Sequence, residues 1–175
     1  HSLERLKSQG MSAQARGRIR REINSLMTEA EMAAAGDATS RPGASDFLAR
    51  MAARGWMTII QTSNSVRCVQ DVLSRLAFPL PNAICGREST RNPKPHPEGV
   101  RRVLRTFGIS PREAVVIGDG DYDIELGRTI GARTIWVVNE KRPQLAGGRP
   151  ELQVSSLAEA FELLVGERQL QGVGA

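Results

Sequence analysis

Short apolar runs alternate with amphipathic stretches over most of this 175-residue chain. The apolar runs predict strands at residues 57–61, 83–85, 114–117, 133–138 and 152–154. Between them, apolar residues recur at every third or fourth position, which predicts helices near residues 47–52, 66–76, 97–107, 124–130 and 156–165. Strands that alternate with helices favour an α/β fold. We therefore expect a doubly wound parallel sheet with helices on both faces.

The pattern divides the chain into three parts. Residues 1–40 show helical spacing and no strand, with Ser12 placed to cap a long helix, so we expect a small N-terminal helical cap or lid segment. Residues 41–165 form the α/β core, which opens on a Pro-Gly turn signal. Residues 166–175 are expected to be a disordered tail.

Composition argues against several kinds of partner. The net charge is +5, but the arginines are spread along the chain and aromatic residues make up only 4%, so we expect a solvated surface and no nucleic-acid partner. No apolar run approaches the length of a membrane span, which predicts no membrane partner. Cys68 and Cys85 match neither metal-binding nor disulfide spacing, so a reduced, cytoplasmic compartment is expected.

An acidic loop follows the apolar run at residues 114–117. It places Asp119, Asp121 and Asp123 between the end of a predicted strand and the start of a helix, the edge at which open α/β sheets bind ligands. Carboxylates this close repel one another unless a cation lies among them. Mg²⁺, held by one or two carboxylates and by phosphate oxygens, meets that need. A structural interpretation stays open for Asp121, which is well placed to cap the helix.

Two further loops carry groups that suit phosphate. Thr62, Ser63 and Asn64 directly follow a predicted strand and precede a helix, whose amino terminus favours anions; the alternative is that one of them only caps the helix. Lys94 stands between two prolines, on a stiff loop of a chain that otherwise prefers arginine. A lysine there supplies a point charge for a phosphate oxygen, although an ordinary surface lysine is the other interpretation.

In this order, the three loops resemble the motifs of the haloacid dehalogenase-like hydrolase superfamily, in its phosphoglycolate-phosphatase-like branch. Residues 59–65 (IIQTSNS) resemble the second motif, residues 92–97 (NPKPHP) the third, and residues 118–123 (GDGDYD) the acidic fourth. The resemblance runs from about residue 41 to residue 165. It implies a Rossmann-like hydrolase core and a small phosphorylated substrate.

The resemblance also implies roles for single residues. Thr62 would contact the phosphoryl group, with Ser63 and Asn64 beside it. Lys94 would neutralise the nucleophile and the phosphate. Asp119 would ligate Mg²⁺, and Asp123 would support the metal or its waters. These roles imply a Mg²⁺-dependent phosphatase that hydrolyses a small phosphomonoester through an aspartyl-phosphate.

The family's first motif, an Asp-x-Asp at the end of a buried strand, has no counterpart before these loops. The first aspartate is Asp37, and neither Asp37 nor Asp46 follows a predicted strand. We therefore expect that the sequence begins inside the family pattern and that these 175 residues alone have little phosphatase activity. The alternative is a non-catalytic module or subunit that binds phosphate and metal.

The same gap in the pattern affects the sheet, because the strand of the first motif is its middle strand in this family. We expect the strands at residues 57–61 and 114–117 to pair directly, to leave a gap, or to borrow a strand from another chain. Unpaired central edges favour association, so a homodimer is one expected outcome.

Overall fold

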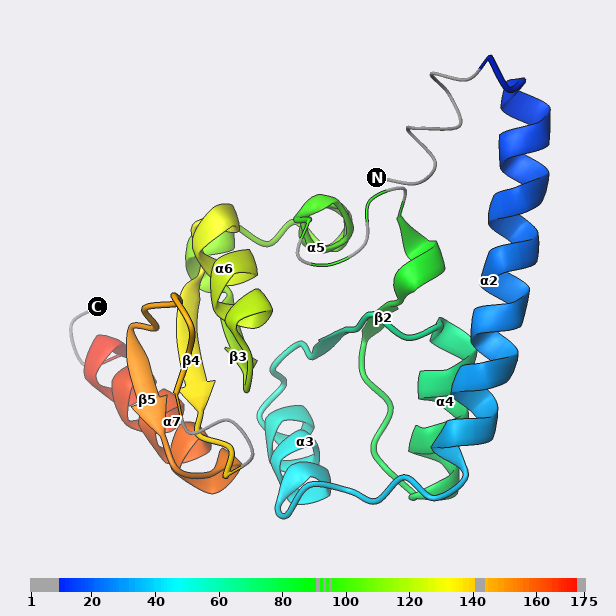
Figure 1. Ribbon diagram of the computed structural model, residues 1–175. Helices are drawn as coiled ribbons and strands as arrows, with labels where there is room; N and C mark the ends of the chain where they lie inside the picture. The colour runs from blue at the N-terminus through cyan, green and yellow to red at the C-terminus, as the bar shows by residue number, and fades with distance from the viewer. Residues whose placement is uncertain (1–9, 91, 93, 95, 141–143, 173–175) are drawn as a thin grey trace.

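A computed structural model describes residues 10–90, 92, 94, 96–140 and 144–172 of the chain (Figure 1). Its strands are β1 (Ile59–Gln61), β2 (Ala83–Cys85), β3 (Val115–Gly118), β4 (Arg133–Val137) and β5 (Leu152–Val154). Its helices are α2 (Ala13–Ala35), α3 (Ala44–Ala53), α4 (Val66–Arg75), α5 (Glu98–Thr106), α6 (Asp121–Ile130) and α7 (Leu157–Gly172), with short 3₁₀ turns η1 (Arg87–Ser89) and η2 (Pro111–Glu113). Strands and helices alternate from β1 to β4, as the sequence predicts.

The strand pairings in the described residues are all parallel, which confirms the predicted α/β class, but they form two separate sheets. β1 pairs with β2 in one sheet, and the order β3-β4-β5 makes the other. The register places Ile59 opposite Ala83, Val115 opposite Arg133, and Ile135 opposite Leu152. Of the three arrangements expected for β1 and β3, the structure therefore has the gap between them.

Helices cover both faces of the three-stranded sheet. On one face α3 and α7 pack against β4, with the Phe161 ring at 6.3 Å from both the Phe47 and the Trp56 rings, measured between centroids. On the other face α5 and α6 form a second apolar cluster that includes Leu104 and Leu126. Successive residues of β3 alternate between these two clusters, as the two-residue period of a strand requires.

Serine side chains cap the N-termini of α2, α4 and η2. Ser12 accepts a hydrogen bond from the Ala15 amide at 3.2 Å and caps α2, as predicted. Ser65 caps α4 in the same way, accepting from the Cys68 amide at 3.2 Å. Ser110 and Glu113 form a capping box at η2. Each serine satisfies amides that a helix's first turn leaves without partners, which is why these elements start where they do.

The N-terminal helix α2 packs on the body of the protein through α4 (Figure 1). The Arg75 guanidinium donates to the Ala35 carbonyl at 2.6 Å and holds the end of α2 against α4. Leu26 on α2 is 62% exposed, so part of the helix's apolar face lies open to solvent. Residues 13–35 of the expected N-terminal segment thus form one helix that packs on α4.

Several element boundaries differ from the sequence prediction. β1 begins at Ile59, two residues later than predicted. α6 begins at Asp121, three residues earlier than predicted. Gly120 is its N-cap residue, and the Asp123 side chain accepts a hydrogen bond from the Gly120 amide. α7 continues to Gly172, so the stretch expected to be a disordered tail is helical up to that residue. Among the described residues, no helix is both long and apolar enough to cross a bilayer.

A close contact between α6 and the sheet gives a test of this packing. A Cβ at Gly127 of α6 would lie 2.4 Å from the Thr134 Cγ2 atom and 3.1 Å from the Val116 Cβ atom. We expect Gly127→Ala to destabilise the protein by about 1–3 kcal/mol, because α6 would have to move away from β3 and β4. Urea denaturation of the purified protein measures this change.

Gly17 of α2 is the matched control, since a Cβ there meets only the flexible end of Arg21 at 3.7 Å. Gly17→Ala should raise helix stability by about 0.5–1 kcal/mol, the usual gain in an open helical position. Equal unfolding midpoints for Gly127→Ala and the wild type would contradict the close packing of α6 on the sheet.

Candidate functional site

The candidate site lies where β1 and β3 end and their following loops begin. The loop of Thr62 follows β1, the loop of Asp119 follows β3, and a cavity lies between the two strands. In α/β proteins these carboxyl ends of strands are where ligands bind, because backbone amides and helix amino termini gather there.

An ion pair joins two of the residues that the sequence singles out. The Lys94 ammonium donates to the Asp123 carboxylate, and the two side chains are only 14% and 18% exposed. Lys94 belongs to the segment between β2 and α5, whereas Asp123 lies in the first turn of α6, so the pair connects elements of the two sheets. The prolines on either side of Lys94 lie outside the described residues.

Gly118 makes room for the Asp123 side chain. A Cβ at Gly118 would lie 2.2 Å from the Asp123 Cγ atom, so no larger residue fits at the end of β3. The Gly120 amide also donates to the Asp123 carboxylate at 3.3 Å. Asp123 is thereby fixed between the strand end and Lys94.

Asp119 is more accessible than Asp123, with 45% of its side chain exposed. Its Oδ2 atom accepts from the Arg41 guanidinium at 3.1 Å and from the Asn139 amide at 2.8 Å. Arg41 also donates to the Val138 carbonyl at 2.8 Å, which ties the start of the core to the end of β4. Sequence reasoning missed both partners. Asn139 follows a predicted strand and shares that signal with Asp119, whereas nothing in the sequence marks Arg41.

Asp121 has a different role from its two neighbours. Its carboxylate accepts from the backbone amides of Ala146, Gly147 and Gly148 at 3.1, 3.0 and 3.0 Å, and so anchors the loop between β4 and β5. These hydrogen bonds hold the pKa of Asp121 below its ordinary value. Asp121 does not form the helix cap that the sequence left open as an alternative, because Gly120 is the N-cap residue and Asp121 is already helical.

Two hydrogen bonds of Thr62 hold the loop after β1 in place. The Thr62 hydroxyl accepts from the Asn64 amide at 3.1 Å, and the Thr62 amide donates to the Cys85 carbonyl at 3.0 Å. Ser65 is the N-cap residue of α4. The alternative that Thr62, Ser63 or Asn64 only caps this helix is therefore wrong. In the described part of the chain, no hydrogen bond or ion pair joins Thr62 to Lys94, Asp119 or Asp123.

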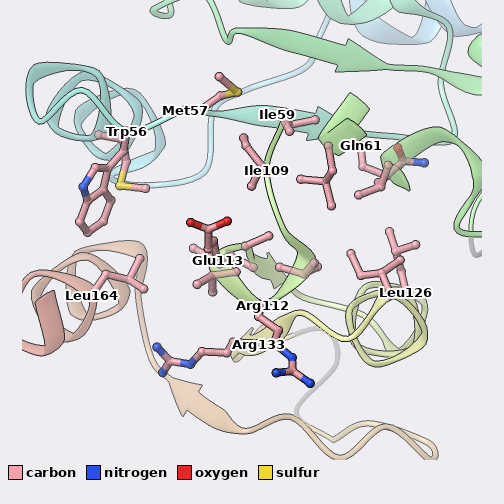
Figure 2. Close-up of a pocket in the computed structure, with 18 of the residues that line it drawn as sticks. Trp56, Met57, Ile59, Gln61, Ile109, Arg112, Glu113, Leu126, Arg133 and Leu164 are labelled. Atoms are coloured by element: carbon pink, nitrogen blue, oxygen red, sulfur yellow. The ribbon is translucent and has the colours of Figure 1, made fainter. Parts of the chain in front are cut away.

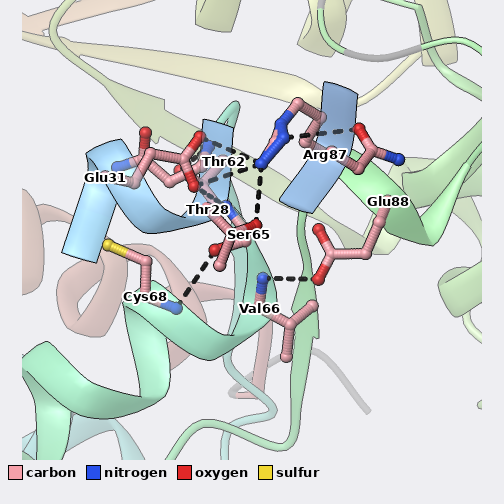
Figure 3. A network of polar contacts seen from close by, with 10 residues as sticks. Thr28, Glu31, Thr62, Ser65, Val66, Cys68, Arg87 and Glu88 are labelled. Carbon is pink, nitrogen blue, oxygen red and sulfur yellow. Dashed lines mark hydrogen bonds and ion pairs between the residues drawn. The ribbon is translucent and has the colours of Figure 1, made fainter. Parts of the chain in front are cut away.

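A polar network fixes α2 beside this loop (Figure 3). The Glu31 carboxylate accepts from the Ser65 amide at 2.8 Å and pairs with Arg87 at 3.2 Å. Arg87 also donates to the Thr28 hydroxyl at 3.1 Å. The Arg87 and Glu31 side chains are 9% and 15% exposed, so the pair is well shielded from solvent. These contacts between distant segments leave no signal in the sequence.

The oxygen donors of the acidic loop suit a hard divalent cation. No group of three His, Cys, Asp or Glu side chains with metal-binding geometry occurs among the residues that the structure describes. Mg²⁺ does not require one, because it is usually held by one or two carboxylates together with phosphate oxygens and water. The exposed carboxylate of Asp119, with Asp123 four residues further on, fits that kind of site.

Fold and site together define an α/β protein with carboxylates, a lysine and hydroxyls at its strand ends. The sequence pattern of the haloacid dehalogenase-like hydrolase family matches residues 2–137, which is more than half of the chain. The chain therefore belongs to this family.

Similarity to individual proteins agrees with that assignment. Phosphoserine phosphatase of Thermus thermophilus is 38% identical over 69 residues, which cover 39% of this chain and 28% of that protein. Glyceraldehyde 3-phosphate phosphatase of Pyrococcus furiosus is 29% identical over 106 residues, covering 59% of this chain and 44% of that protein. The chain thus spans less than half the length of these relatives.

A solved structure shares the fold of this chain. The crystal structure of a predicted phosphoglycolate phosphatase from Haemophilus somnus superposes with a TM-score of 0.65 and 21% identity. The superposition covers 88% of this chain and 68% of that one. At this identity the likeness speaks for the fold alone.

The Asp121 anchor predicts a pH dependence. A carboxyl whose pKa is lowered by folding contributes stability above its ordinary value of 3.8, and loses that contribution as the pH falls through its folded-state pKa. We expect the wild type to lose stability from about pH 5 downward more steeply than Asp121→Asn, which cannot take up this proton. Urea midpoints measured across the acid range compare the two slopes.

Asp37→Asn is the matched control, because Asp37 is an exposed aspartate outside the site. Its acid slope should equal that of the wild type. If Asp121→Asn also followed the wild-type slope, the three amide hydrogen bonds would not be lowering the pKa of Asp121.

Proposed function

We propose that the protein acts as a Mg²⁺-dependent phosphatase on a small phosphomonoester, by way of an aspartyl-phosphate. Its membership of the hydrolase family supports this, as do two relatives named for hydrolysis of phosphoserine and glyceraldehyde 3-phosphate. The single observation that carries the proposal is the Lys94–Asp123 ion pair next to the acidic loop, since it keeps a positive charge beside metal-binding carboxylates.

Each residue would contribute through its charge or its hydrogen-bonding groups. Asp119 would hold Mg²⁺, supported by Asp123, and the ion when bound would supply positive charge to the phosphoryl oxygens. Lys94 would stabilise the same developing charge with its ammonium group, which acts as a point charge. The phosphate oxygens would accept hydrogen bonds from the hydroxyl, side-chain amide and backbone N–H groups of Thr62, Ser63 and Asn64.

The nucleophile is not provided by any of these residues. An aspartyl-phosphate needs a carboxylate that attacks phosphorus, and the residues matched here are ligands and charge partners instead. We therefore propose that these 175 residues bind phosphate and Mg²⁺ with little turnover. Catalysis would need the Asp-x-Asp motif of the family to be supplied to the site.

The second candidate is a non-catalytic module or subunit that binds phosphate and metal. The observation that favours it is the same lack of a matched first motif in the sequence. Both candidates predict ligand binding, and they differ in turnover by the full-length gene product. For either, the free and buried thiols of Cys68 and Cys85 are consistent with a proposed cytoplasmic location.

The proposal is tested by binding and turnover measurements on one set of variants. By titration calorimetry, Asp119→Asn should weaken Mg²⁺ binding at least tenfold, and Lys94→Met should weaken binding of inorganic phosphate similarly, because each removes a charge that the ligand contacts. Asp37→Asn is the control and should bind Mg²⁺ as the wild type does. Full-length gene product should hydrolyse an aryl phosphate with Mg²⁺, whereas the 175-residue protein should not exceed an Asp119→Ala control.

Two results would contradict these expectations. Equal Mg²⁺ affinity in the wild type and Asp119→Asn would remove Asp119 from the metal site. Binding of both ligands without turnover by the full-length product would favour the non-catalytic module over the phosphatase.

A further inference from the structure

Three groups from two other segments hold Asp119, which directly follows β3. The Arg41 guanidinium and the Asn139 side-chain amide both donate to its carboxylate, at 3.1 and 2.8 Å. The indole N–H of Trp136, a buried residue of β4, donates to its backbone carbonyl at 3.4 Å. Backbone and side chain of Asp119 are thus both tied to the neighbouring strand, so these contacts decide where its carboxylate points.

Both side-chain donors reach the same oxygen of Asp119, Oδ2. Within the described part of the chain, neither a hydrogen bond nor an ion pair reaches the other oxygen, Oδ1. A carboxylate oxygen has two lone pairs, so two donors fill those of Oδ2 and leave those of Oδ1 for another partner. Because 45% of the side chain is exposed, that partner can come from solution.

The backbone holds both donors in place. Arg41 opens the turn before α3, where its carbonyl accepts from the Ala44 amide at 3.1 Å and where Pro42 restricts its backbone. The Arg41 guanidinium also donates to the Val138 carbonyl at 2.8 Å. Asn139 directly follows Val138, whose amide donates to a β5 carbonyl at 2.9 Å. Both donors therefore start from fixed points, and this lets them fix the carboxylate in turn.

Asp123 is held by a different set of contacts. It pairs with Lys94 and lines the cavity between β1 and β3 (Figure 2). Neither Asp119 nor Arg41 nor Asn139 borders that cavity. The two carboxylates that the proposed function gives to Mg²⁺ are thus positioned by independent groups, so the contacts of one can be removed while those of the other stay.

We propose that Arg41 and Asn139 are positioning residues, which hold Oδ2 of Asp119 so that Oδ1 faces the divalent cation. The proposal rests on the proposed function, in which Asp119 is a ligand of Mg²⁺, and adds the residues that orient this ligand. Groups that donate hydrogen bonds to a metal ligand fix its direction, and their loss commonly lowers metal affinity by about one to two orders of magnitude.

The choice of cation gives this role a signature. Mg²⁺ requires its ligands in near-ideal octahedral directions, whereas Ca²⁺ accepts a flexible geometry and longer bonds. A carboxylate that is free to turn therefore loses more affinity for Mg²⁺ than for Ca²⁺. A residue that only stabilised the fold would change the affinity for the two ions alike.

Titration calorimetry of the 175-residue protein with each ion alone provides the test. Asn139→Ala removes a neutral donor, so it frees the Asp119 carboxylate without changing the charge of the site. It should weaken Mg²⁺ binding about tenfold and Ca²⁺ binding by no more than about twofold. Arg41→Lys keeps the positive charge but loses the two-armed guanidinium, and it should shift the ratio of the two affinities in the same direction.

Asn82→Ala is the matched control. Asn82 accepts a hydrogen bond from the Thr58 amide at 2.8 Å, but it lies just before β2, at the opposite end of the strands from the site. Its loss should leave both affinities unchanged. Urea midpoints show which variants are folded, and if Asn139→Ala is not, Arg41→Lys decides by the same ratio.

Equal Mg²⁺ affinity in Asn139→Ala and the wild type would overturn the proposal, as would an equal loss of Mg²⁺ and Ca²⁺ binding. Asp119→Asn separates this failure from failure of the proposed function. If Asp119→Asn binds Mg²⁺ as the wild type does, the proposed metal site is wrong and the positioning role with it. If Asp119→Asn loses Mg²⁺ while Asn139→Ala and Arg41→Lys keep it, only the positioning role is wrong.

Discussion

The contact between Lys94 and Asp123 is the interaction on which the site depends. It joins the segment after the two-stranded sheet to the helix after β3, at the end of a cavity that otherwise separates these parts. With both side chains largely buried, the lysine charge offsets a carboxylate that would be costly to bury alone. Gly118 adds the space that this arrangement needs, because any side chain there would displace Asp123. Asp119 is then left as the accessible carboxylate of the loop.

The site residues do not stand alone but are tied to the rest of the fold. Arg41 links Asp119 to the beginning of the core and to the end of β4. Glu31 and Arg87 attach α2 to the loop before α4. One polar network therefore joins α2 to the loop after β1, so a movement of α2 would shift the residues that follow β1. Asp121 serves the fold instead, since its hydrogen bonds hold the loop before β5.

Local patterns were enough to predict most elements, because apolar spacing and serine caps act over a few residues. The long helix that begins after Ser12 is an example. Among the site residues, Asp119 and Asp123 could be placed together at the end of one strand, because both follow that strand within a few residues. The partners Arg41 and Glu31 could not, since they meet their targets across 78 and 34 residues of chain and depend on tertiary packing. For the same reason, the division of the sheet could be narrowed to three arrangements but not to one.

The central claim is that residues 62–65, Lys94 and residues 119–123 surround one phosphate and divalent-ion site. The most direct test is a two-dimensional ¹H–¹⁵N NMR titration of the protein with inorganic phosphate in the presence of Mg²⁺. The account predicts that the amide signals of all three segments shift together along one binding curve, while those of the exposed helix α2 near Ser12 stay in place. Shifts confined to the acidic loop, with residues 62–65 unaffected up to saturation, would contradict it.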